Sequence, residues 1–236
     1  MAPSQRQVAF SMANALALTR STVGKKVLMA ASGIVLSSFV VVHMLGNLKV
    51  YQGATKYDAY AEFLRAAGHP VLGHGQLLWI ARIVLLACLA VHVDAAVRLW
   101  LRNRAARDVG YERFRDLSFS RASRTMRWGG VAILAFVVYH LLHLTWGSAH
   151  PDFEPGSPYR NVVAGFRVWP VSAAYIAAMI PLGLHVYHGL WSTTQTLGVQ
   201  DPRVLRCRRP LALLVAGAIV LGNVSIPFAV LLGWLK

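Results

Sequence analysis

Residues 169–196 read WPVSAAYIAAMIPLGLHVYHGLWSTTQT, and this stretch decides the class of fold. It contains no Asp, Glu, Lys or Arg. A helix needs about 20 predominantly apolar residues to cross the roughly 30 Å hydrocarbon core of a bilayer. The stretch therefore predicts a membrane-spanning helix. Its two histidines, His185 and His188, would be ionisable groups inside the membrane, where such groups are rare.

The composition of the whole chain also indicates a membrane protein. Of its 236 residues, 56% are apolar and only 14% are charged, and the mean hydropathy is +0.48. A soluble domain carries about 25% charged residues. The composition therefore excludes an ordinary soluble enzyme, a disordered chain and a disulfide scaffold. The two cysteines, Cys88 in an apolar segment and Cys207 in a basic loop, are not expected to pair.

Four more segments are long and apolar enough to span a bilayer. No fixed repeat and no strand pattern lies between them. Because backbone groups in lipid must bond within their own helix, the sequence predicts an all-α integral membrane protein with five transmembrane helices. We expect residues 1–23 to form a cytoplasmic N-terminal arm and residues 24–236 to form the bundle. The predicted spans are Gly24–Leu48, Gly75–Leu101, Thr125–Gly147, Trp169–Thr196 and Pro210–Leu235.

The charge distribution predicts the orientation. Seventeen of the 24 Lys and Arg residues lie in the N-terminal segment through Lys26 and in the loops 98–127 and 197–209, which share one side. Six lie in the segments on the other side, and Arg82 lies within a span. Basic loops stay in the cytoplasm, so the N-terminus is expected there and the C-terminus outside. Since topology accounts for the formal net charge of +15, no nucleic-acid partner is expected.

Six histidines fall inside the predicted spans. A single histidine in an apolar span often only packs or bonds a carbonyl, but six in four helices suggest a function. At 1.5 Å per residue, His43 and His140 lie towards the outer face, and His92 and His185 lie towards the inner face. Each layer then holds one histidine from each of two helices. The six are His43, His92, His140, His143, His185 and His188.

Two imidazoles that face each other across a bundle can ligate a haem iron from both sides. Two layers therefore predict two b haems, one in each half of the membrane. His143 and His188 follow His140 and His185 by three residues and lie on nearly the same helix face, so either member of each pair is open as the ligand. A zinc site is the competing possibility, but no thiolate or carboxylate completes a tetrahedral set within one layer.

Four motifs resemble those of a known family. They are SG-x9-HMLGNL (32–48), AVHV (90–93), RWG-x10-H (127–140) and HVYHGLWS (185–192). In this order and in these spans, they resemble the single-chain, five-helix, two-haem cytochrome b membrane anchor of succinate dehydrogenases and fumarate reductases. The resemblance covers about residues 24–234. The stretch 57–68, YDAYAEFLRAAG, also resembles the outer loop helix of that family.

The resemblance implies that His43 and His140 ligate the outer haem and that His92 and His185 ligate the inner one. This is the pairing that helix depth also predicts. It further implies a bacterial cytoplasmic-membrane subunit of respiratory complex II, bound to a flavoprotein and an iron–sulfur subunit. The chain would contain no catalytic residue, because the dicarboxylate chemistry of the tricarboxylic acid cycle would occur in a partner chain. A higher oligomer is left open.

Cationic side chains are needed near haem propionates, and a quinone requires an apolar slot with a proton-accepting group. Arg82 and Arg127 are candidates for the first role, although Arg82 could equally reach the outer interface. By resemblance, Glu62 is the outer quinone candidate, and Trp191 is a second candidate near the inner face. A solvated loop residue and an interfacial tryptophan are the alternatives for these two. The quinone is expected to be menaquinone.

Two other functions fit parts of the sequence. The chain could be the b-type cytochrome subunit of another quinone-linked dehydrogenase or of a hydrogenase, and the identity of the partner subunit distinguishes these. It could also be a proton-coupled transporter with a histidine relay, but no inverted repeat supports this. Asp94 is the only acid within a span. It could assist protons or simply pair with Arg98 four residues later.

Overall fold

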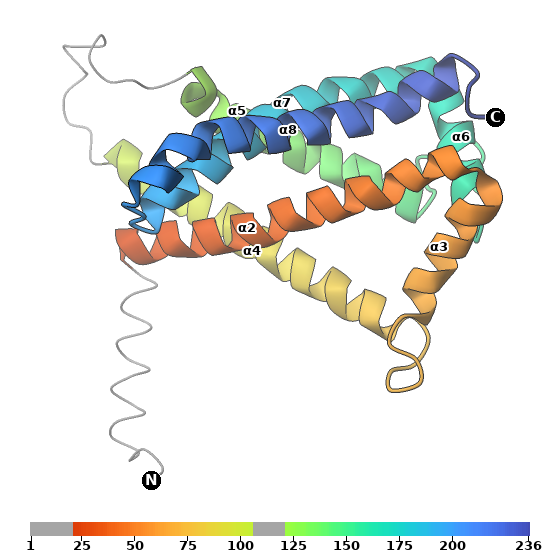
Figure 1. Ribbon diagram of the computed structural model, residues 1–236, viewed down its shortest axis with the longest axis horizontal. Coiled ribbons are helices and arrows are strands. Elements are labelled where there is room, and N and C mark those ends of the chain that lie inside the picture. The colour runs from red at the N-terminus through yellow and green to blue at the C-terminus, as the bar shows by residue number, and fades with distance from the viewer. Residues whose placement is uncertain (1–20, 106–120) are drawn as a thin grey trace.

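The computed structural model describes residues 21–105 and 121–236, and all the regular elements in these two ranges are helices (Figure 1). Five of these helices are long and apolar enough to cross a membrane. This confirms the prediction of an all-α, multi-pass membrane protein. The five helices are α2 (Thr22–Asn47), α4 (Gln76–Ala105), α5 (Arg121–His140), α7 (Trp169–Thr196) and α8 (Pro202–Leu231).

The predicted bounds of α7 agree with the structure, but those of α8 do not. The predicted start at Pro210 is wrong, because α8 begins at Pro202. The side chain of Asp201 accepts a hydrogen bond from the Arg203 N–H at 2.7 Å and caps the helix. Proline fits the first helical position, where its missing N–H leaves no bond unmade. The basic residues before Pro210 therefore lie on a helix rather than in a loop.

The other spans differ from their predicted bounds by a few residues, apart from α5. This helix ends at His140 and continues as a π-helical turn, η2 (Leu141–Thr145). A π turn has wider spacing than an α-helix, so it changes the angle between His140 and His143. Most of the predicted cytoplasmic arm and the centre of the basic loop 98–127 lie outside the described residues.

Three short helices connect the spans at one end of the bundle. The turn η1 (Leu48–Gln52) and α3 (Ala54–Ala66) follow α2, and α6 (Pro158–Arg167) precedes α7. The loop helix expected at 57–68 corresponds to α3, which starts and ends slightly earlier. The sequence analysis did not predict α6, although Ser157 followed by Pro158 is a typical helix start.

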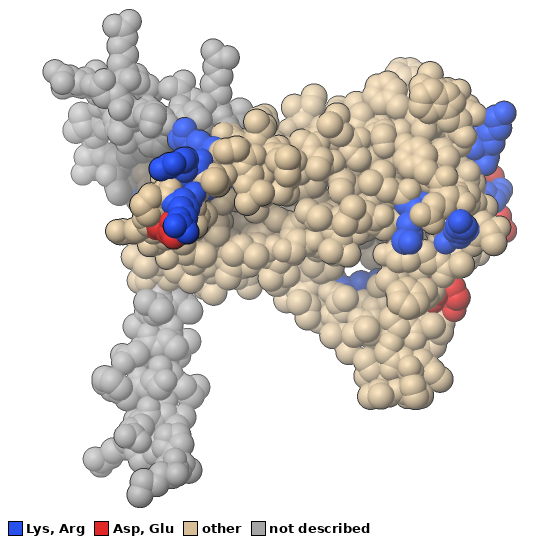
Figure 2. Space-filling view, in the orientation of Figure 1, with Lys and Arg blue, Asp and Glu red and all other residues tan. Residues whose placement is uncertain are grey.

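The helices form a bundle with two distinct ends (Figure 1). We call them the α6 end, where α3, α6 and the C-terminus lie, and the Pro202 end, where α2 and α8 begin. Helix α2 packs along α4, α5 packs along α7, and α7 packs along α8. On the face shown in Figure 2, charged side chains gather at the two ends and a broad uncharged zone lies between them. This arrangement suits a helix bundle in a bilayer.

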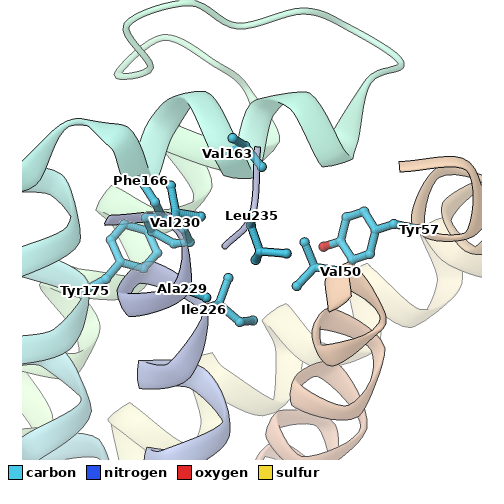
Figure 3. Packing of buried hydrophobic residues seen from close by; sticks show 9 residues of the cluster. All are labelled: Val50, Tyr57, Val163, Phe166, Tyr175, Ile226, Ala229, Val230 and Leu235. Carbon is cyan, nitrogen blue, oxygen red and sulfur yellow. The ribbon is translucent and has the colours of Figure 1, made fainter. Parts of the chain in front are cut away.

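The largest buried cluster closes the α6 end (Figure 3). It joins η1, α3, α6, α7 and α8. A smaller cluster of Met44, Val186, Ala216 and Ile219 joins α2, α7 and α8 further along the bundle. Together they join α2, α7 and α8, and Phe136 and Tyr139 of α5 pack against the first cluster. The nine members of the first cluster are Val50, Tyr57, Val163, Phe166, Tyr175, Ile226, Ala229, Val230 and Leu235.

Candidate functional site

Two pairs of histidine rings face each other within the bundle. His43 of α2 and His140 of α5 have ring centres 5.8 Å apart, with an angle of 84° between the ring planes. His92 of α4 and His185 of α7 have ring centres 6.0 Å apart, at 61°. Each pair therefore joins two helices that are distant in the sequence, and each helix contributes one histidine.

The two pairs lie at different levels of the bundle. His92 contacts α2 at Met29, Ser32 and Gly33, which precede His43 by ten to fourteen residues. This corresponds to roughly 15–21 Å along the helix axis. On α5, His185 lies beside Gly130, ten residues before His140, or about 15 Å. The His43–His140 pair is nearer the α6 end, and the His92–His185 pair is nearer the Pro202 end.

The tautomer of His92 follows from its hydrogen bond. Its Nδ1 lies 3.1 Å from the Met29 carbonyl oxygen, which can only accept, so Nδ1 carries the proton. The other nitrogen, Nε2, is then free to bind a metal, as in metal sites where a second group holds the far nitrogen. A Cβ on Gly33 would lie 3.2 Å from His92 Cε1, so the ring approaches α2 closely because residue 33 is glycine.

The other three rings have different surroundings. His140 Nδ1 lies 3.3 Å from the Tyr175 hydroxyl. His43 stacks on Phe39, with ring centres 5.2 Å apart. His185 Nδ1 is buried and has no hydrogen-bond partner among the described residues. The two pairs therefore differ in how their histidines are held.

His143 and His188 face neither pair across the bundle. His143 is fully buried between the rings of Tyr139 and His150, with ring centres 5.6 and 4.8 Å away. His188 packs edge-on against Trp191, with ring centres 5.0 Å apart. The structure thus separates the members of each i, i+3 pair, a choice that helix depth alone left open. It brings His140 and His185, rather than their neighbours, against a histidine of another membrane-spanning helix.

The spacing of the two pairs fits a metal bound between them. Metal–imidazole bonds of about 2 Å on either side of one ion hold two ring centres roughly 6 Å apart. Both pairs have this separation. No group of three or more His, Cys, Asp or Glu side chains that could hold a metal ion occurs in residues 21–105 and 121–236. The donor sets present there are thus pairs of imidazoles, which suit an ion whose remaining ligands come from a planar cofactor.

The cationic candidates pack against aromatic rings. The Arg82 guanidinium lies over Trp79 at 4.9 Å, and Arg127 lies over Trp100 and Trp128 at 5.4 and 5.1 Å. Among the described residues, neither guanidinium is hydrogen-bonded to a histidine of the two pairs. Asp94 pairs with Arg98 at 2.7 Å, as its i, i+4 spacing predicted.

The two quinone candidates lie in contrasting environments. Glu62 on α3 is exposed, and its carboxylate accepts hydrogen bonds from His74 at 2.9 Å and Arg65 at 3.1 Å. These two bonds, His74 first, hold the pKa of Glu62 below its ordinary value of 4.5. Trp191 near the Pro202 end is half-buried and lies beneath the guanidinium groups of Arg208 and Arg209, at 5.7 and 5.1 Å.

Tyr175, whose hydroxyl lies near both His140 and His143, was not predicted from the sequence. One signal was available. Tyr175 is a polar aromatic residue six positions into an apolar span, so its depth of about 9 Å matches that of His140 in the neighbouring span. Its contact with both histidines depends on how α5 and α7 are rotated, which depth does not specify.

Comparisons with known protein families, with curated proteins and with solved structures each found no match. The fold therefore defines the class: a multi-pass α-helical membrane protein with paired histidines inside the bundle. The particular function within this class has to be argued from the site.

Proposed function

We propose that this chain is the cytochrome b membrane-anchor subunit of a succinate:quinone oxidoreductase or fumarate reductase in a bacterial cytoplasmic membrane. It would pass electrons between an iron–sulfur subunit and menaquinone through two b haems. The observation that carries the proposal is the two pairs of facing histidines, 5.8 and 6.0 Å apart, at two levels of one bundle. The four motifs, with their resemblance to that family, support the choice of partner.

Four residues would hold the two haems. His43 and His140 would ligate the haem near the α6 end, and His92 and His185 would ligate the one near the Pro202 end. When bound, haem supplies reversible one-electron transfer. The chain's own part is to fix the ligands: the Met29 carbonyl holds His92, and Gly33 lets its ring approach α2. Arg82 and Arg127 are the proposed cations for the propionates.

The charge count supports an orientation with the Pro202 end in the cytoplasm. The flavoprotein and iron–sulfur subunits would then bind at that end. Dicarboxylate chemistry would take place in those partners, which is why the chain itself needs no catalytic group. The α6 end, with Glu62 on α3, would face outward.

For the quinone we favour the Trp191 end over Glu62. A quinone carbonyl accepts hydrogen bonds, and two nitrogens beside Trp191, His188 Nδ1 and Arg208 Nε, are buried without a partner among the described residues. The Glu62 carboxylate is already held by two surface side chains. We expect Trp191→Leu to lower quinone turnover by about tenfold or more, and Glu62→Gln to change it by less than about twofold. Trp169→Leu, at the other end of α7, is the matched control.

Haem stoichiometry tests the proposal directly. We expect the purified membrane complex to contain about two b haems per chain, and His43→Ala and His92→Ala each to reduce this to about one. His74→Ala, on an exposed loop histidine, should keep both. A flavoprotein and an iron–sulfur protein should co-purify; a hydrogenase subunit in their place would change the assigned complex. A wild-type protein without haem would refute the proposal and favour a transporter.

A further inference from the structure

The Tyr175 hydroxyl lies between two histidines that have different roles. It is 3.3 Å from Nδ1 of His140 and 2.9 Å from Nδ1 of His143. A hydroxyl has one proton, so it can donate to only one of these nitrogens and accepts from the other. The protonation of both rings is therefore linked through Tyr175.

The direction of the hydrogen bonds from His140 through Tyr175 to His143 follows once His140 binds a metal. A neutral imidazole that offers Nε2 to a metal carries its proton on Nδ1. His140 Nδ1–H then donates to the Tyr175 oxygen, and the Tyr175 O–H donates to His143 Nδ1. The shorter contact, at 2.9 Å, is the one that the hydroxyl donates, as expected for an O–H donor. The proton of His143 is then on Nε2, which is buried without a hydrogen-bond partner among the described residues.

The chain of hydrogen bonds ends at His143. The next ring, His150, uses both of its nitrogens elsewhere: Nε2 donates to the Asn161 carbonyl at 2.8 Å, and Nδ1 accepts from the Asp152 N–H at 3.0 Å. It contacts His143 only by stacking. The arrangement thus fixes an orientation instead of continuing to the surface.

We infer that Tyr175 and His143 are positioning residues for His140, which hold its Nδ1–H and direct its Nε2 towards His43. This inference rests on the proposed function, because it assigns His140 as a haem ligand. It also gives His143 a role other than metal ligation. His92 is held in the same way, but by the backbone carbonyl of Met29.

Packing keeps the Tyr175 hydroxyl in place. The Tyr175 ring is part of the buried cluster at the α6 end (Figure 3) and contacts Phe136 and Phe166, with ring centres 5.0 and 4.8 Å away. On the far side, α6 presses against His143 at Gly165, where a Cβ would lie 2.7 Å from His143 Cε1. Both side chains are buried, so packing restricts their movement away from His140.

The hydrogen bond from His140 Nδ1–H to Tyr175 has an electronic consequence that can be measured. An acceptor on the far nitrogen makes the ligating nitrogen more basic, which favours the oxidised iron and lowers the midpoint potential. Removing the acceptor should therefore raise the potential of the haem near the α6 end and leave the other haem unchanged. The second haem is an internal control in the same molecule.

The test uses the purified complex and five variants, of which His43→Ala identifies the haem that His140 ligates. We expect Tyr175→Phe to keep two haems, to raise the midpoint potential of the haem that His43→Ala removes, and to shift its low-spin EPR signal. Tyr139→Phe is the matched control, since the Tyr139 ring stacks on His143 but its hydroxyl contacts no histidine nitrogen in the described chain. His143→Leu should shift the same haem in the same direction, and His143→Asn, which retains an acceptor, should restore it.

The results separate this inference from the proposed function. Two haems with unchanged potentials and EPR signals in Tyr175→Phe would overturn the positioning role and leave the proposed function standing. A wild-type complex without haem would overturn both. If Tyr175→Phe fails to assemble, the comparison of His143→Leu with His143→Asn decides: a shift that only the Leu variant has supports the inference, and equal behaviour of the two refutes it.

Discussion

Two glycines, Gly33 on α2 and Gly130 on α5, lie directly against histidine rings of the pair near the Pro202 end. The closest approach is at Gly33, where the position of a Cβ is only 3.2 Å from His92 Cε1. A longer side chain there would have to displace the ring, because the Met29 carbonyl already holds the imidazole from the same helix. The geometry of this pair therefore depends on a residue with no side chain.

We expect Gly33→Leu to destabilise the bundle by about 1–3 kcal/mol through overpacking and to reduce the haem content from about two to about one per chain. Pyridine haemochrome assay of the purified complex measures the loss. Gly217→Leu on α8 is the control, because no atom outside the adjacent backbone of its own helix lies within 4 Å of its Cβ position. Equal haem content in the Gly33 variant and the wild type would contradict this account of His92.

For single residues, depth along a span was enough to predict which histidines lie at the same level of the bundle. The position of each histidine along its span placed His43 level with His140 and His92 level with His185, and these rings do face each other. Depth could not separate His140 from His143, because the π turn η2 changes the angle between them. It also could not reveal Tyr175, whose contacts depend on helix rotation.

At the scale of elements, α8 differs most from expectation. The predicted start at Pro210 treated this proline as a helix boundary, but the helix passes through Pro210 and begins at Pro202. The earlier start is set by Asp201, a local cap that hydropathy does not detect. Similarly, α6 is too polar for a hydropathy search and is held by packing between α3, α7 and α8. Long apolar helices were predictable, whereas caps and interfacial helices were not.

Removing the cap of α8 should loosen its first turns. We expect Asp201→Ala to cost about 0.5–2 kcal/mol locally and to speed amide hydrogen exchange at the start of α8, with little effect beyond Pro210. Asp201→Asn should behave like the wild type, because asparagine also caps helices. Hydrogen-exchange mass spectrometry of the detergent-solubilised protein gives this comparison. Unchanged exchange in the Ala variant would mean that packing alone holds the start of α8.

For the whole molecule, the distribution of Lys and Arg predicts that the Pro202 end faces the cytoplasm. A native cysteine can be used to test this orientation. Cys207 on α8 is exposed at that end, whereas Cys88 is half-buried within α4. We expect a membrane-impermeant maleimide to label Cys207 in inside-out vesicles stripped of peripheral subunits, but not in intact cells.

A second cysteine makes the topology test two-sided. In a Cys207→Ser background, His74→Cys places a thiol on the exposed loop at the α6 end. Intact cells should be labelled at this position. The reverse result at both sites would invert the orientation and, with it, the face on which the partner subunits bind.

The pairing of helices has a consequence for how such a protein is built. Helices α2 and α4 pack along each other, α5 packs along α7, and α7 packs along α8, so the bundle has two halves, which are also joined by the buried cluster of Met44, Val186, Ala216 and Ile219. Each histidine pair takes one ring from each half. On the proposed function, each cofactor therefore links the two halves of the bundle. Insertion of the helices can precede cofactor loading, and loading then adds two links to the apolar cluster that already joins the halves, so a shortage of haem should leave chains whose halves are held less tightly.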